Sequence, residues 1–139
     1  ADATFLACAG LIRLGMKKIM RPISVDKMMP AIAQGAIGIE QRVNNEAVSS
    51  ILRPINHELT EIQLKTERAF LKALDGSCRT PIGGYCTVEN QSIRLKGEVL
   101  RLDGSEVVSG SWRGDISEAT FLGESAGCSI RERIGDSFF

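Results

Sequence analysis

The stretch SIRLKGEVLRLDGSEVVSGSW, residues 92–112, predicts an antiparallel β-hairpin. Two strand-like runs, Ser92 to Asp103 and Glu106 to Trp112, meet at Asp103-Gly104, a dipeptide that is typical of hairpin turns. A third strand-like run, Gly84 to Val88, comes shortly before them. Because consecutive strands joined by short turns usually pair with each other, the sequence predicts a small three-stranded antiparallel sheet.

Helical patterns flank the three strands. Glu58 to Leu74 carries apolar residues at three- and four-residue spacing, and Gly76 is expected to end this helix at a positive φ. Residues 115–134 form the last predicted helix, which Asp115 and Glu118 open in a pattern like a capping box. Helices around a short antiparallel sheet predict an α+β fold with the helices packed on one face of the sheet.

The first part of the chain has weaker patterns. It predicts a helix over Ala3 to Met16, a strand within residues 28–43, and a short helix that Asn44-Asn45-Glu46 opens, with one asparagine as its N-cap, and that ends near Leu52. The first helical pattern begins almost at residue 1, and no basic segment precedes its apolar run, which argues against a signal peptide. We therefore expect a fragment of a longer protein.

Composition excludes several classes of function. The 139 residues include 17 lysines and arginines against 17 aspartates and glutamates, so no net charge favours nucleic acid or an acidic membrane. No apolar run is long enough to cross a bilayer. The composition is that of one domain of ordinary size with a packed core, which we expect in the cytoplasm.

Four cysteines, Cys8, Cys78, Cys86 and Cys128, raise the question of metal or disulfide chemistry. They form no CxxC pair and accompany a single histidine, so a metal site is not expected and reduced thiols are. Three of them lie on apolar helix or strand patterns and are expected to pack. Cys78 instead follows a helix end in a glycine-flanked bend beside Arg79, where it is either a small buried thiol or a reactive one.

Two further positions are ambiguous from the residues alone. Gln34-Gly35 is either a tight turn or a turn that offers backbone N–H groups to an anion. Arg13, on a helix with apolar neighbours, is either a surface residue or a carboxylate-binding one. His57, at a helix start, is expected to be a capping or surface residue.

Several motifs together resemble the porphobilinogen deaminase family, also called hydroxymethylbilane synthase. They are LACAGLIRLGM, MMPAIAQGAIGIEQR, TERAFLKALDGSCRTPIGGY and the LDGSEVV hairpin, which together cover essentially the whole chain. The run Glu67-Arg68-Ala69-Phe70, followed by Gly76-Ser77-Cys78 and Pro81-Ile82-Gly83, is the most specific part. One departure is Ala33, where the family usually has glycine.

The resemblance implies a three-domain enzyme much longer than this chain. Its first two domains are similar to periplasmic binding proteins and enclose the active-site cleft. Residues 1–27 would be the last helix of domain two and the hinge, residues 28–43 the strand that returns to domain one, and residues 44–139 the C-terminal cofactor-carrying α+β domain. The catalytic aspartate of the family would lie upstream of residue 1, so no catalytic residue is expected in this chain.

The resemblance also implies the chemistry. Cys78 would carry a dipyrromethane cofactor through a thioether, while Arg13, Gln34 and Gly35 would contact the cofactor or substrate. Four porphobilinogen units would condense on this primer before water releases hydroxymethylbilane, the linear precursor of haem. The full-length enzyme would be a cytoplasmic monomer with no nucleic-acid or membrane partner, and this chain alone would be inactive. Two alternatives stay open, a non-catalytic α+β module with a structural cysteine and a thiol-dependent redox protein.

Overall fold

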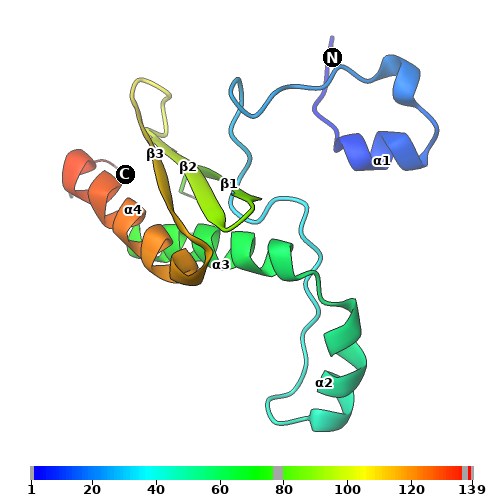
Figure 1. Ribbon diagram of the computed structural model, residues 1–139. Helices are drawn as coiled ribbons and strands as arrows, with labels where there is room; N and C mark the ends of the chain where they lie inside the picture. Colours follow the sequence, from blue (N-terminus) through cyan, green and yellow to red (C-terminus); the bar gives the residue numbers. More distant parts are fainter. Residues whose placement is uncertain (1, 77–79, 136–137, 139) are drawn as a thin grey trace.

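A three-stranded antiparallel sheet with two long helices on one face dominates the structure, a computed structural model that describes residues 2–76, 80–135 and 138 (Figure 1). The strand order is β1-β2-β3, and the two helices pack on each other as well as on the sheet. The predicted α+β fold is confirmed. These elements are β1 (Ile82–Glu89), β2 (Ser92–Leu100), β3 (Val107–Asp115), α3 (Glu58–Ala73) and α4 (Ala119–Ile134).

Strict alternation along β2 places the core between the sheet and the helices. Ile93, Leu95 and Val99 are fully buried, while Arg94 between them is exposed on the uncovered face of the sheet. Phe70 of α3 is also fully buried and meets these residues in one apolar cluster. Burying a side chain of this size contributes about 1.5–3 kcal/mol, so this cluster holds the unit together.

The hairpin is confirmed, but β2 ends at Leu100, three residues before the predicted end at Asp103. The Asp103 carboxylate accepts hydrogen bonds from the N–H and hydroxyl groups of Ser105, which turns the chain locally. The Arg101 N–H donates to the Glu106 carbonyl oxygen at 2.9 Å and closes the loop. A turn held by the Asp103 side chain and by one backbone hydrogen bond therefore replaces the last part of the predicted ladder.

Helix α3 ends where it was predicted to end, but a different residue takes the positive φ that terminates it. Asp75, not Gly76, takes the positive φ, at +53°. Asp tolerates this conformation through its short polar side chain. A Cβ atom on Gly76 would lie 2.6 Å from a methyl group of Leu71 and 2.5 Å from one of Ile82. The glycine therefore leaves room for the Leu71 and Ile82 side chains at the end of the helix.

The first 43 residues differ most from expectation. Helix α1 spans only Cys8–Arg13 of the predicted Ala3–Met16. The strand predicted within residues 28–43 is not formed, because the structure has there only an isolated bridge between Ala31 and Gly83. A strand needs a neighbour to accept and donate its backbone hydrogen bonds. Residues 36–43 have no such neighbour in the described part of the chain and are exposed.

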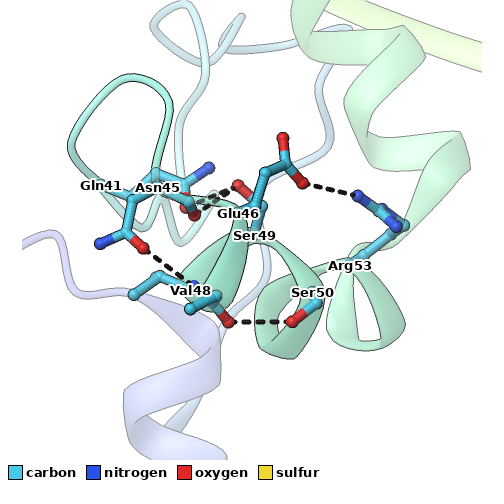
Figure 2. Close-up of polar contacts among 8 residues, drawn as sticks. Gln41, Asn45, Glu46, Val48, Ser49, Ser50 and Arg53 are labelled. Carbon is cyan, nitrogen blue, oxygen red and sulfur yellow. Dashed lines mark hydrogen bonds and ion pairs between the residues drawn. The ribbon is translucent and has the colours of Figure 1, made fainter.

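Helix α2 (Glu46–Leu52) confirms the predicted cap and stands apart from the sheet (Figure 1). The Asn45 side chain accepts a hydrogen bond from the Val48 N–H, and the Ser49 hydroxyl donates to the Gln41 side chain (Figure 2). An ion pair joins Arg53 to Glu46 at 3.8 Å. Short-range polar contacts thus account for this helix, and no residue of it is buried.

Within the described residues, no helix combines the length and the apolar character that a bilayer crossing needs.

Candidate functional site

A tight turn, residues 30–36, runs along the outer edge of β1. Ala31 forms an antiparallel bridge with Gly83, and the Gly84 N–H donates to the Pro30 carbonyl oxygen at 2.9 Å. The edge strand of a sheet has unpaired backbone groups on its outer side. The turn satisfies some of them and covers this part of the edge.

The glycine pair Gly83-Gly84 lets the turn approach so closely. A Cβ atom on Gly83 would lie 2.8 Å from Cγ of Met29, and one on Gly84 would collide with the side chain of Ile32. Successive residues of a strand point to opposite faces of the sheet. Met29 and Ile32 therefore pack against the edge of β1 from its two faces, where the two successive glycines leave room for them.

Glu67 of α3 fastens the turn from the helix side. Its Oε2 accepts a hydrogen bond from the Ala33 N–H at 2.8 Å, and its Oε1 accepts one from the Cys86 N–H at 2.9 Å. The residue is only 8% exposed. Desolvation by this burial raises the pKa of Glu67, and the two backbone hydrogen bonds, which favour the charged form, oppose that rise.

Cys86 lies beside this carboxylate and is not a nucleophile. Burial, the largest cause, raises the pKa of its thiol to about 11, and the negative charge of Glu67 adds to the rise. The Thr66 side chain hydrogen-bonds to the thiol and acts in the opposite direction. A neutral, buried thiol of this kind is a packing residue, as the sequence predicts.

A hollow of about 410 Å³ opens beside the turn. Its polar lining includes Gln34, Thr60, Gln63 and Tyr85, all of which can donate hydrogen bonds. Glu67 is the one acidic residue in this lining, and both of its carboxylate oxygens are already engaged. The hollow therefore offers neutral polar side chains, which can both donate and accept hydrogen bonds, and no free carboxylate.

The predicted site residues are partly brought together. Gln34 and Gly35 are exposed neighbours in the turn, and both line the hollow. Arg13 is exposed at the end of α1, which lies away from the sheet (Figure 1). Cys78 lies outside the described residues. The structure therefore places the two turn residues, which are consecutive in the sequence, at the hollow, and it places Arg13 elsewhere, in α1.

Three other predictions have clear outcomes. His57 is confirmed as a cap, because its Nδ1 accepts a hydrogen bond from the Thr60 N–H at 3.3 Å. The prediction that Cys8 and Cys128 pack in the interior is wrong, since both are exposed. The helix that carries Cys8 buries no residue, and Cys128 lies on the outer side of α4.

In the part of the chain that the structure describes, no group of three or more potential metal-ligating side chains comes together.

Sequence reasoning missed Glu67 as part of the site. Its position in the helix lies off the main apolar stripe, so the sequence pattern predicts a surface residue. The available signal was its place at the head of the Glu67-Arg68-Ala69-Phe70 run that carries the family resemblance. Only the fold shows that its carboxylate has two backbone donors to bind.

Ala33 gives a first testable prediction, because it adopts φ +60°, in the left-handed region. A residue with a Cβ atom loses about 1–2 kcal/mol there, whereas glycine enters this region freely at a smaller entropic cost. Ala33→Gly should therefore raise the free energy of unfolding by up to about 1 kcal/mol. Urea unfolding followed by circular dichroism measures the change.

Ala36→Gly is the matched control in the same turn, because Ala36 has no positive φ. Its substitution should leave the stability unchanged or lower it. Equal effects of the two glycines would contradict the strain assigned to Ala33.

The fold is an open-faced α+β unit with a hollow beside its edge strand, and comparison with known families shows to which family it belongs. Residues 62–132 match the model described as "Porphobilinogen deaminase, C-terminal domain". Residues 1–50 match the model described as "Porphobilinogen deaminase, dipyromethane cofactor binding domain". The chain belongs to the porphobilinogen deaminase family, and the cofactor of the matched domain is dipyrromethane.

Relatives named porphobilinogen deaminase match across the whole chain. The protein of Nitrobacter winogradskyi is 44% identical over 140 residues, which cover 100% of this chain and 44% of the relative. That of Paracoccus denitrificans is 42% identical over 140 residues, covering 100% of this chain and 45% of the relative. The chain thus spans less than half the length of the relatives it matches.

Proposed function

We propose that this chain is the C-terminal part of a hydroxymethylbilane synthase, which joins four porphobilinogen units on a covalently bound dipyrromethane primer. The observation that carries the proposal is the match of two porphobilinogen deaminase models to successive parts of one chain. The product would be hydroxymethylbilane, the linear tetrapyrrole of haem biosynthesis.

Cys78 is proposed as the attachment point, through a thioether. The bound group would supply a pyrrole to which further units are joined. Gln34 and Gly35 would contact it at the hollow, where polar side chains can hydrogen-bond to its substituents. Arg13 would hold carboxylates in the assembled enzyme, and its exposure leaves the guanidinium free to do so.

The proposed domain division is residues 1–27, 28–43 and 44–139, with the catalytic aspartate in the part of the enzyme that this chain does not cover. Large apolar side chains in the first 43 residues are exposed, including Phe5 at 75%, Ile37 at 86% and Val43 at 87%. Apolar surface of this extent favours a partner that covers it. We propose that the partner is the N-terminal part of the same enzyme, as a monomer in the cytoplasm.

The test joins this chain to the N-terminal part of the Nitrobacter winogradskyi relative and compares the hybrid with the chain alone. The hybrid should convert porphobilinogen and carry a dipyrromethane adduct on the Cys78 peptide in denaturing mass spectrometry. Cys78→Ser should abolish both adduct and turnover. The chain alone should show no turnover, because the aspartate is missing.

Cys128→Ser is the matched control, because it removes an exposed thiol from the same domain. It should keep adduct and activity. A hybrid that folds but carries an unmodified Cys78 would favour a structural cysteine, and reversible oxidation of that thiol would favour a redox protein. Turnover by the chain alone would place the catalytic group within residues 1–139.

A further inference from the structure

We propose that Glu67 is a positioning residue that fixes the Gln34-Gly35 turn to the sheet-and-helix unit, so that the two residues stay aimed at the hollow. This inference rests on the proposed function in one respect, the role of the turn as a cofactor contact. The attachment of the turn to α3 and β1 is argued from contacts among the described residues alone.

The internal hydrogen bonds of the turn leave the Ala33 N–H for another acceptor. The Gln34 N–H donates to the Ala31 carbonyl oxygen at 3.0 Å, and the Ala36 N–H donates to the Ala33 carbonyl oxygen at 3.2 Å. Both bonds lie within the turn and do not attach it to anything else. The 2.8 Å bond from the Ala33 N–H to Glu67 is the one that reaches a long helix.

Glu67 is well suited to act as a fixed point. It lies in α3 next to Thr66, which is fully buried, and three residues before Phe70 in the core. Its second oxygen holds the Cys86 N–H of β1. A single carboxylate therefore ties the turn to the helix layer and to the sheet layer at once, and hydrogen bonds to a charged group are among the stronger ones.

The conformation of the turn makes this anchor necessary. Ala33 at φ +60° and Gly35 at φ +81° both lie in the left-handed region, which alanine disfavours. Without the acceptor, Ala33 would gain by leaving that region, and Gln34 would move with it. The carboxyl group of Glu67 thus holds a backbone conformation that the local sequence does not favour by itself.

The test is a pH titration of the 139-residue chain, labelled with ¹⁵N and followed through its amide resonances. The amide signals of Ala33 and Cys86 should shift together, with one midpoint above the usual glutamate value of 4.5, because burial raises the pKa of Glu67. The buried Cys86 thiol, with a pKa of about 11, stays neutral throughout this range.

Glu67→Gln should abolish the common transition and speed amide hydrogen exchange at Gln34, whose N–H is bonded to the Ala31 carbonyl oxygen, by about tenfold, while Phe70 keeps its protection. Glu124→Gln, which neutralises an exposed glutamate of α4, should change neither the pH transition nor the exchange rates in the turn. If Glu67→Gln fails to fold, the wild-type titration still decides the matter.

A wild-type titration in which the Cys86 amide responds and the Ala33 amide does not would overturn the proposal. Unchanged exchange at Gln34 in a folded Glu67→Gln chain would also overturn it. Because neither readout uses porphobilinogen or the cofactor, the anchor can fail while the adduct on Cys78 is found. Equally, the anchor can hold when no adduct is found, so the two proposals fail separately.

Discussion

Phe70→Ala is expected to remove most of the stability of the sheet-and-helix unit. Phe70 is fully buried, and its ring centroid lies 6.0 Å from that of Trp112. Truncating a buried phenylalanine costs about 3–5 kcal/mol, because transfer energy is lost and a cavity remains. Domains of ordinary size have only about 5–15 kcal/mol in total, so the variant should be largely unfolded at mild denaturant concentrations.

Urea unfolding followed by tryptophan fluorescence measures this effect, since Trp112 is the one tryptophan of the chain. Phe121→Ala is the control, because Phe121 of α4 is 66% exposed. It should change the free energy of unfolding by no more than about 0.5 kcal/mol. A loss of less than about 1 kcal/mol for Phe70→Ala would show that this side chain is not the centre of the core.

Gly123→Ala should also destabilise the unit strongly, although it improves the intrinsic helix propensity of α4 by about 1 kcal/mol. The added Cβ atom would collide with the Thr66 carbonyl oxygen and lie 2.8 Å from Cβ of Ala69 and 3.0 Å from the Phe70 nitrogen. Two of these atoms belong to the backbone of α3, which cannot rotate out of the way. The helices must separate, and we expect a net loss of about 3 kcal/mol.

Thermal unfolding compared with Ser125→Ala tests this prediction. Ser125 lies on the exposed side of the same helix, so its substitution should raise stability slightly through helix propensity. If Gly123→Ala were as stable as Ser125→Ala, the close approach of α3 and α4 would be wrong. Because Glu67 lies in α3, a separation of the two helices should also loosen the turn at the hollow.

The sequence by itself determined the elements that local chemistry controls. The helix over residues 58–74, an asparagine cap on the short helix before it and the Asp103-Gly104 turn all appear where they were predicted, apart from small shifts of their ends. Each depends on residues only a few positions apart along the chain. The motifs around Glu67 and Pro81 were also enough to indicate the family.

Only the tertiary structure decided the strand within residues 28–43 and the role of Glu67. The predicted strand is not formed, because pairing depends on a neighbour that the sequence of one segment does not contain. Glu67 looks like a surface residue by spacing, yet its carboxylate is buried between Ala33 and Cys86, which lie 34 and 19 positions away in the chain. Contacts over such separations arise from packing, and the anchoring of the turn at the hollow is therefore a property of the fold.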